Sequence, residues 1–229
     1  MEFTKLSNRL DLVASFVPAG ARLLDVGSDH AYLPIALLQE GKIEAAIAGE
    51  VVEGPYQSAL QNVADNGLED KIEVRLADGL AAFEPADSIS CITIAGMGGR
   101  LIADILEAGL EKLASVSRLV LQPNNREDEL RAWLVDNDFR IVDEAILEEN
   151  EKFYEILVVE QGSQELTAKE LRFGPYLMRE QAPAFVQKWS KEVEKLAFAL
   201  EQVPVENQSA RASLEERIAH IKEVLNASK

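Results

Sequence analysis

Apolar runs of strand length alternate with segments of helical period along most of the chain from Ala21 onward. The predicted strands are residues 21–27, 43–50, 72–78, 88–96 and 117–123. The segments between them carry the apolar period of helices, at residues 32–41, 55–67, 98–114 and 126–138. Strands and helices in strict alternation form parallel sheets with helices on both faces, so the pattern predicts a doubly wound α/β fold.

The alternation ends at residues 139–150 and 152–162, two strand-like segments separated by a short turn. Such a hairpin closes the sheet with one antiparallel strand at its end, whereas a dehydrogenase Rossmann domain finishes on parallel strands. This Rossmann-like topology is typical of the class I methyltransferases that use S-adenosylmethionine (SAM). We predict that α/β fold class for residues 1–162.

Helical segments flank the predicted sheet on both sides. Residues 6–18 have one apolar face, which we interpret as a helix covering the sheet. Residues 183–203 and 211–228 carry near-heptad apolar stripes, which predict an antiparallel, coiled-coil-like helical hairpin. We therefore predict a methyltransferase domain at 1–162 and a helical domain at 163–229. The stripe residues are Phe185, Trp189, Val193, Leu196, Leu200 and Val203, then Leu214, Ile218, Ile221 and Leu225.

Composition narrows the class of protein. The 229 residues are 47% hydrophobic and 28% charged, which is typical of soluble globular proteins. No stretch approaches the roughly 20 apolar residues of a spanning helix, and the N-terminus lacks the layout of a secretory signal, so we expect a cytoplasmic protein. The single cysteine, Cys91, lies in an apolar run and is expected to be buried in a strand. His30 and His220 are far apart in sequence, so no metal site is expected.

The formal net charge of −17 is unevenly distributed. Residues 1–164 hold 13 Lys or Arg and 30 Asp or Glu, whereas residues 165–229 hold 10 of each kind. Phosphate contacts are made by Lys and Arg, so this balance argues against a generic polyanion-binding surface on the main domain. It leaves room for a local basic patch on the tail.

The stretch LLDVGSDHAYLPIAL, residues 23–37, joins the first strand to the first helix with a single glycine, Gly27. A dinucleotide site needs three glycines because the backbone approaches a pyrophosphate, but SAM has no phosphate. Its methionine carboxylate can be held by loop amides and by the helix start near Pro34. Its amino group needs a carboxylate, which Asp25 supplies, and Gly27 allows close approach of the ligand.

Two further carboxylates end the next strands. Glu50, 23 residues after Gly27, can accept hydrogen bonds from both ribose hydroxyls. Asp78 can accept from the adenine amine, with Gly79 leaving room for the ring. Singly, each carboxylate is more often a helix cap or turn former, but the ends of three successive parallel strands face one crevice. The predicted cofactor site also includes their neighbours Ser28, His30, Tyr32, Val51, Ala95, Gly96 and Met97.

The fourth and fifth strands end in IAGMGGR, residues 94–100, and in LQPNN. Gly96, Gly98 and Gly99 either clear space for a target base beside the methyl group or form a tight strand-to-helix turn. The sequence leaves both interpretations open. Asn124 is a candidate for a hydrogen bond to a base edge, although Asn after Pro favours a turn.

These motifs carry a family likeness. LSNRLDLVASFVPAGARLLDVGSDHAYLPIAL, GEVVEGPYQSAL, LADGL, IAGMGG and LQPN resemble the bacterial TrmK family, the tRNA (adenine(22)-N1)-methyltransferases. The likeness is strongest over about the first two thirds of the chain, and DVGSDHAYLP with IAGMGG is its most specific pair. The resemblance implies a SAM-dependent enzyme that methylates N1 of an adenine in the D-arm region of tRNA, with the helical tail helping to hold the RNA.

The chemistry of adenine N1 suggests roles for the remaining polar residues. Its lone pair needs placement rather than a strong base, and the base must leave its stack. We predict that Asp29 stabilises the cationic product ring; its alternative is the N-cap of the helix at 31–40. Arg9 would pair with Asp29 or hold a tRNA phosphate, unless it is an ordinary surface charge. The predicted substrate contacts are Gly98, Gly99, Arg100 and three tail lysines taken to point outward, Lys188, Lys191 and Lys195, although such charges most often form only a solvated face.

Two other function classes keep parts of this site. A SAM-dependent methyltransferase acting on a small molecule or a protein would use the same cofactor residues, with the helical hairpin as a dimer interface. A nucleotide-binding sensor would use the hairpin to recruit a partner, and would prefer NAD or ATP or bind SAM without turnover. The expected oligomeric state is a monomer or a weak dimer.

Overall fold

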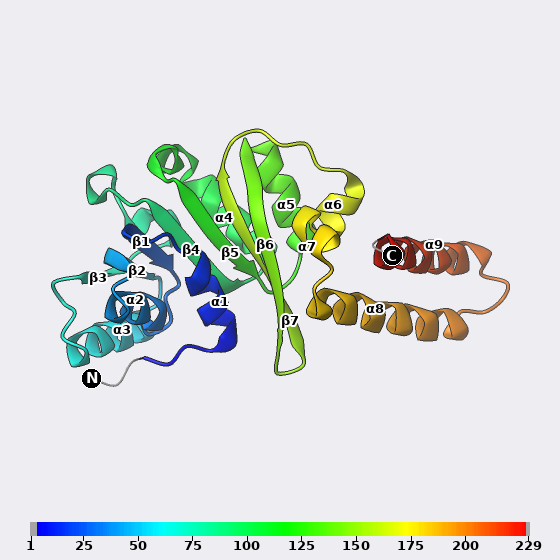
Figure 1. Ribbon diagram of the computed structural model, residues 1–229, viewed down its shortest axis with the longest axis horizontal. Helices are drawn as coiled ribbons and strands as arrows, with labels where there is room; N and C mark the ends of the chain where they lie inside the picture. Colours follow the sequence, from blue (N-terminus) through cyan, green and yellow to red (C-terminus); the bar gives the residue numbers. More distant parts are fainter. Residues whose placement is uncertain (1–3, 228–229) are drawn as a thin grey trace.

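The sheet is the frame on which the chain is organised. In a computed structural model that describes residues 4–227, seven strands lie in the order β3-β2-β1-β4-β5-β7-β6 (Figure 1). Strands β1 to β5 are parallel, and β7 is antiparallel to β5 and β6. The predicted doubly wound sheet with a closing hairpin is confirmed. The strand bounds are β1 (Ala21–Val26), β2 (Ile43–Glu50), β3 (Ile72–Leu76), β4 (Cys91–Met97), β5 (Arg118–Pro123), β6 (Phe139–Glu149) and β7 (Lys152–Gln161).

The hairpin differs from the expectation in one respect. Strand β7 is inserted between β5 and β6, so the antiparallel strand is not at the end of the sheet and the edge strand is β6. Strands β6 and β7 pair from Phe139 opposite Gln161 to Glu149 opposite Lys152. Strand β5 pairs with β7 only from Leu119 to Leu121. The turn end of the hairpin therefore projects past the carboxyl end of β5 (Figure 1).

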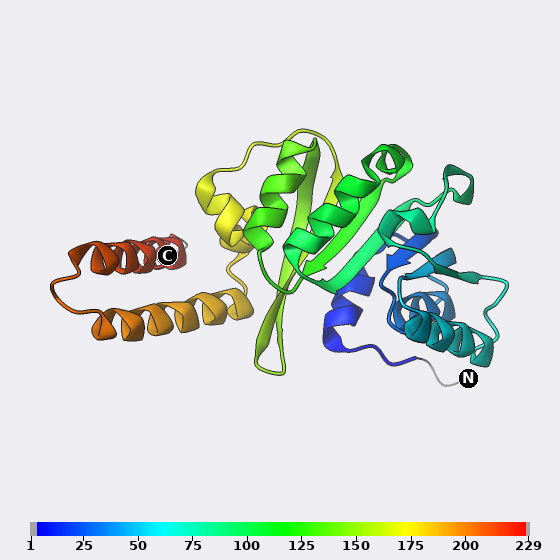
Figure 2. The same cartoon turned by 180° about the vertical axis from the view of Figure 1, so that it is seen from behind.

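Helices cover both faces of the sheet, as predicted (Figures 1 and 2). Successive side chains of a strand point to opposite faces, so Leu23 of β1 packs in one core cluster and Leu24 in the other. The first cluster includes residues of α1 (Asn8–Phe16), α2 (Tyr32–Gln39) and α3 (Glu53–Asp65). The second includes residues of α4 (Gly99–Ala108) and α5 (Glu127–Asp136). Cys91 on β4 is fully buried, as expected.

The helix predicted at 98–114 is interrupted. Helix α4 ends at Ala108, and a 3₁₀ segment, η3 (Leu110–Ser115), follows. A Cβ at Gly109 would lie 2.7 Å from the Cβ of Leu80, so the glycine lets the chain pack closely on the connection between β3 and β4. That contact turns the chain out of the helix, which the apolar period of the sequence does not reveal.

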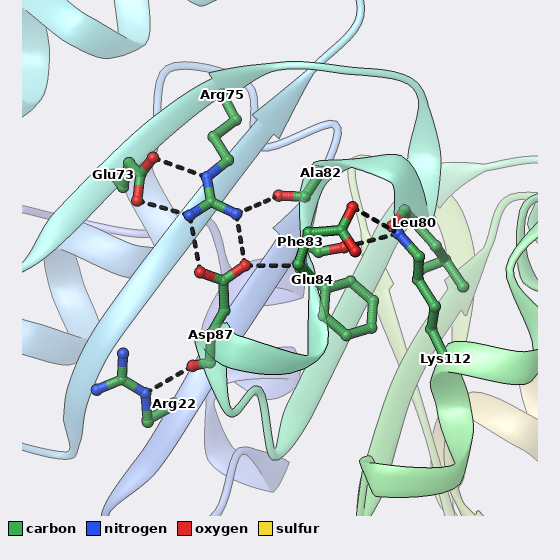
Figure 3. A network of polar contacts seen from close by, with 9 residues as sticks. All are labelled: Arg22, Glu73, Arg75, Leu80, Ala82, Phe83, Glu84, Asp87 and Lys112. Carbon is green, nitrogen blue, oxygen red and sulfur yellow. Dashed lines mark hydrogen bonds and ion pairs between the residues drawn. The ribbon is translucent and has the colours of Figure 1, made fainter.

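An ion-pair network holds the connection between β3 and β4 (Figure 3). This connection contains two short 3₁₀ segments, η1 (Gly79–Ala82) and η2 (Pro85–Asp87). Arg75 on β3 binds Asp87 through both terminal nitrogens, at 2.6 and 2.9 Å, and also binds Glu73. Lys112 of η3 donates to the carbonyl of Phe83 at 2.7 Å. These bonds fix the connection to β3 and to η3.

The tail holds two short helices that were not predicted, α6 (Ala168–Phe173) and α7 (Pro175–Glu180). Helix α6 starts at a capping box of Thr167 and Glu170, and α7 starts at Pro175, so both helices have sequence signals. The predicted helical hairpin is formed by α8 (Pro183–Gln202) and α9 (Gln208–Asn226). No helix among residues 4–227 has the length and apolar character needed to cross a membrane.

The tail core also includes part of the sheet. Phe185, Trp189, Leu196 and Ile221 of the predicted stripes are buried, and they share a cluster with Ile146 of β6. The α8–α9 hairpin extends to one side of the molecule (Figure 1). The division into domains at residue 162 stays a prediction, and residues 1–3, 228 and 229 of the predicted segments lie outside the described residues.

Candidate functional site

The candidate site lies at the carboxyl ends of β1, β2 and β4. Strand β1 has β2 on one side and β4 on the other, so the helices that follow these strands leave toward opposite sides. In open α/β sheets, ligands bind in the crevice at this switch point. Asp25, Gly27, Glu50 and Met97 all lie there, as predicted from the strand ends.

Asp25 is buried, with 4% of its surface exposed. Its two carboxylate oxygens accept hydrogen bonds from the hydroxyls of Ser28, at 2.6 Å, and Thr93, at 2.5 Å. Burial raises the pKa of Asp25 to about 6, against the opposing effect of these two hydrogen bonds. Both oxygens are therefore used inside the protein, and the carboxylate holds the loop that starts at Gly27.

The loop after β1 has an unusual backbone. Asp29, His30 and Ala31 all have positive φ angles, of 44°, 65° and 57°. Non-glycine residues in this region cost on the order of 1 kcal/mol or more each, so other contacts must hold them. The amide of Asp29 donates to Glu50 Oε1 at 2.6 Å, and Asn62 Nδ2 donates to the carbonyl of His30 at 2.7 Å. These bonds tie the loop to β2 and α3.

The predicted N-cap alternative for Asp29 is wrong. The N-cap of α2 is Ala31, and no side chain caps this helix start. The carboxylate of Asp29 is 85% exposed and lies 3.6 Å from His30 Nε2. The ring of His30 lies 5.4 Å from that of Tyr32. The Asp29 side chain thus lies exposed at the rim of the crevice, beside His30.

Gly27 is required by a contact within the protein. Its φ angle is 66°, and a Cβ there would lie 2.4 Å from the Cε of Met97. Met97 ends β4, so the glycine lets the β1 loop and the β4 end close on each other. We predicted a glycine here because a ligand would approach closely, and did not predict the contact with Met97.

Glu50 is buried at the end of β2, and burial raises its pKa. Its Oε1 is bonded to the Asp29 amide, and no donor among residues 4–227 is bonded to Oε2. Val51 and Leu76 lie beside it with exposed side chains, and Leu76 pairs directly with Glu50 across β2 and β3. An unbonded carboxylate oxygen with exposed apolar side chains on neighbouring residues suits a ribose joined to a flat base. Leu76 was not among the predicted site residues.

Asp78 and Gly79 follow at the end of β3. Asp78 is exposed and occupies the N-cap position of η1 without a side-chain hydrogen bond. Gly79 has a φ angle of 50°, and a Cβ there would lie 2.9 Å from Ile105. Gly79 is therefore required by the packing of η1 on α4, and the Asp78 carboxylate is accessible for a ligand.

A polar network links β4, β5 and α1 at the other side of the crevice. Gln122, which is buried, accepts from Arg9 at 2.5 Å and from the amide of Gly96 at 3.0 Å. Asn124 donates to the carbonyl of Gly96 at 2.7 Å and accepts from Gln122 Nε2 at 3.1 Å. Arg9 also lies over the ring of Tyr154, 5.6 Å from its centroid. Arg9 therefore pairs with Gln122 and not with Asp29, and Gln122 was not among the predicted site residues.

The glycines after β4 serve different purposes. A Cβ at Gly99 would lie 2.4 Å from the carbonyl oxygen of Arg126, and one at Gly98 would lie 3.1 Å from Asn125 Oδ1. These two positions support the tight-turn interpretation. Gly96 is exposed, and the neighbouring Ala95 is half-buried against the core. Arg100 is exposed, with Asp104 and Glu129 at 3.9 and 3.8 Å.

The three tail lysines differ in their surroundings. Lys188 does not point outward as predicted: its side chain is 22% exposed and its ammonium binds Glu127 at 2.9 Å and Glu155 at 2.7 Å. Lys191 and Lys195 are exposed along the same face of α8. Lys188 is thus neutralised within the protein, because its partners come from α5 and β7.

The crevice fits SAM in its chemistry. Buried carboxylates end β1 and β2, an exposed one follows β3, and the β1 loop has one glycine where a pyrophosphate would need several. No group of three or more His, Cys, Asp or Glu residues within the described part of the chain is arranged to hold a metal. The sheet order and this crevice together define a class I SAM-dependent methyltransferase.

Comparison with known proteins identifies the family. The model of the TrmK family, tRNA (adenine(22)-N(1))-methyltransferase, matches residues 23–223. The tRNA (adenine(22)-N(1))-methyltransferase of Bacillus subtilis is 40% identical, over 99% of this chain and 99% of its own. The chain belongs to the TrmK family.

Two solved structures support this assignment. A Streptococcus pneumoniae protein in complex with S-adenosyl-L-methionine is 65% identical, covering 97% of this chain and 100% of its own, with a TM-score of 0.90. TrmK from M. capricolum, solved with S-adenosyl-homocysteine, is 27% identical over 96% of this chain and 98% of its own, with a TM-score of 0.83.

Proposed function

We propose that this chain transfers the methyl group of SAM to N1 of the adenine at position 22 of tRNA. The observation that carries the proposal is the family match over residues 23–223, which spans both the crevice and the tail. The crevice supplies carboxylate acceptors for a ribose and an adenine, and the loop after β1 has one glycine where a diphosphate would need several. The site is therefore suited to a sulfonium nucleoside.

On the cofactor side, each residue has a distinct role. When bound, SAM supplies an electrophilic methyl group that needs no further activation. Asp25 fixes Ser28 and the loop amides around the methionine end, and Glu50 Oε2 accepts from the ribose. Val51 and Leu76 contact the base, and Asp78 accepts from its amine. Ser28, His30, Tyr32, Ala95 and Met97 complete the walls.

On the substrate side, the chain orients the base rather than activating it. Unpaired adenine N1 has a free lone pair, so the main task of the enzyme is correct placement. For well-oriented reactants, placement lowers the activation free energy by roughly 7–11 kcal/mol. The exposed Asp29 carboxylate is placed to stabilise the positive charge that develops on the ring. Arg9, Gln122 and Asn124 hold Gly96 in position beside the base.

The tail holds the RNA in this proposal. The main domain carries the excess of acidic residues, so Lys191 and Lys195 on α8 are better placed than most cations to contact phosphates. Arg100 at the start of α4 provides a further contact near the crevice. In this proposal the enzyme acts in the cytoplasm, as a monomer or a weak dimer.

A labelling experiment tests the function. Incubation with methyl-labelled SAM and unmodified tRNA should place the label on a single adenine, identified as 1-methyladenosine after digestion. A transcript with guanine at position 22 is the matched control and should accept no label. Equal labelling of the two transcripts would contradict the assigned position, and absence of transfer to any tRNA would contradict the proposed substrate.

A further inference from the structure

A groove of about 930 Å³ runs between the β6–β7 hairpin, the start of α5 and the helical tail. Asn124 and Tyr154 line it, and both also border the crevice: Asn124 through its bond to Gly96, and Tyr154 through its contact with Arg9. The opposite wall is formed by α8 and α9. A strand leaving the crevice can therefore continue directly into this groove.

The groove has the opposite charge balance from the chain. Six Lys or Arg residues and three Glu or Asp residues line it, although the formal net charge of the whole chain is −17. Two of the three carboxylates are paired with cations: Glu127 with Lys188, and Glu192 with Lys195 and Arg217. Lys188 and Lys191 are also paired with carboxylates outside the groove, Glu155 and Glu148. Lys152 and Arg172 have no carboxylate partner among residues 4–227, and their positive charge favours an anionic ligand.

Arg172, in the last turn of α6, is a half-buried groove cation without a carboxylate partner among residues 4–227. Its guanidinium lies over the rings of Phe173 and Trp189, 5.1 and 5.6 Å from their centroids. Within residues 4–227 it forms no ion pair and donates no hydrogen bond. Burial and the nearby Arg217 lower its pKa. A half-buried guanidinium without an acceptor keeps its fork of donors for an external anion.

Trp189 provides a second observation at the same place. Its side chain lines the groove with 8% of its surface exposed, and its Nε1 has no hydrogen-bond partner among the described residues. Buried donors are normally satisfied, so an unpartnered one calls for an explanation. Arg172 lies over this ring, so the unpartnered indole donor and the guanidinium stand at the same part of the groove.

We propose that Arg172, with Trp189 and Lys191 on α8, forms a subsite for a backbone phosphate of the RNA strand that continues from the target adenine. Phosphate oxygens accept bidentate hydrogen bonds from guanidinium, and Lys191 adds a second charge. The inference rests on the proposed function, because it takes tRNA as the substrate. It adds a specific anchor, on a helix that the sequence did not predict.

Arg172→Gln tests the subsite. Equilibrium binding of unmodified tRNA to the full chain, measured at several salt concentrations, should weaken about 10-fold or more at 0.1 M salt. The magnitude of the slope of log affinity against log salt should fall by about 0.7–0.9, which corresponds to the loss of one phosphate contact. The KM for tRNA should rise while kcat at saturating tRNA and the affinity for SAM stay unchanged. Lys191→Gln, at an exposed position, should change the same quantities in the same direction to a smaller extent.

Arg179→Gln is the matched control. Arg179 lies on the neighbouring helix α7 and stacks on Tyr176 at 4.6 Å, but it does not line the groove, so tRNA binding should be unchanged. Equal weakening by Arg172→Gln and Arg179→Gln, or no weakening by Arg172→Gln and Lys191→Gln, would overturn the subsite. If the unaltered enzyme does not methylate tRNA, the proposed function itself fails; if it does and Arg172→Gln behaves like it, only the subsite fails.

Discussion

Two ion-pair networks in this molecule differ in their exposure to water. The first, around Arg75, Asp87 and Glu73, fixes the connection between β3 and β4, and its arginine side chain is partly exposed (Figure 3). The second consists of Arg131 on α5, Glu144 on β6, Glu155 on β7 and Lys188 on α8. Arg131, Glu144 and Glu155 are essentially inaccessible to solvent. The first network is local, whereas the second joins three elements of the sheet region to the tail.

Burial changes what such a network contributes. At the surface, water screens the charges, so forming or removing a pair changes the free energy of unfolding little. In the interior, desolvation offsets much of the attraction, but removal of one partner leaves an uncompensated charge. Glu155 shows both effects: burial opposes its ionisation, but Arg131 and Lys188 outweigh this and hold its pKa below the usual range. The buried network is therefore the more sensitive of the two.

The largest expected effect comes from Arg131→Met. The substitution leaves Glu144 buried without its cation and Glu155 with Lys188 alone, so we expect a loss of about 3–5 kcal/mol in the free energy of unfolding, measured by urea denaturation. Arg75→Met is the matched control in the exposed network and should cost about 1 kcal/mol. Adding Glu144→Leu to Arg131→Met should recover part of the loss. Equal costs for the two arginines would show that burial does not separate the networks.

Asp25 sharpens the comparison, because it is a buried carboxylate with hydroxyl partners and no cation. Its pKa of about 6 lies above the ordinary value of 3.8, so the folded state binds more protons between these values. The free energy of unfolding therefore falls as pH rises from about 4 to about 6, by up to about 3 kcal/mol. The Asp25→Asn side chain stays neutral at all these pH values. The free energy of unfolding of the variant minus that of the natural chain should therefore be more positive at pH 8 than at pH 4.5.

Urea denaturation at the two pH values measures this shift. The difference between Asp25→Asn and the natural chain includes any weakening of the bonds to Ser28 and Thr93, which is present at both pH values. Only its change with pH reports the buried charge. A difference that is the same at pH 4.5 and pH 8 would be at odds with a raised pKa.

The smallest effect is expected from Asp87→Asn. Hydrogen bonds from Arg75 hold the pKa of Asp87 at about 2. A lowered pKa contributes stability that is present above the ordinary value near 4 and is lost as pH falls toward 2. Because solvent screens this partly exposed pair, we expect a cost of about 1 kcal/mol at pH 7. Denaturation curves at pH 7 and pH 3 should show the cost shrinking at the lower pH; a constant cost would point to packing instead.

The sheet could be predicted because its signal is local. Each strand is an apolar run with a turn former or an acidic residue near its end, and each long helix has its own period. The insertion of β7 between β5 and β6 has no local signal, since it depends on which strands pair. Helices α6 and α7 have capping signals at Thr167 and Pro175, but each is shorter than two full turns and shows little periodicity.

The site was only partly predictable for a related reason. Asp25, Gly27 and Glu50 stand at strand ends, and strand ends are readable in the sequence. Gln122 and Asn62 act through contacts with residues 113 and 32 positions away in the chain, which no sequence pattern indicates. Lys188 looked like an exposed lysine of an amphipathic helix because its carboxylate partners lie on α5 and β7.

Lys188 and Trp189 are neighbours in sequence, yet one closes the buried network and the other forms a wall of the groove. A single turn of α8 thus anchors the helical tail to the sheet region and forms part of the groove wall. Transplanting residues 163–229 onto another methyltransferase would leave this turn without its carboxylates. A transplanted helical tail would keep these partners only if the β6–β7 hairpin and the first turn of α5 were transferred with it.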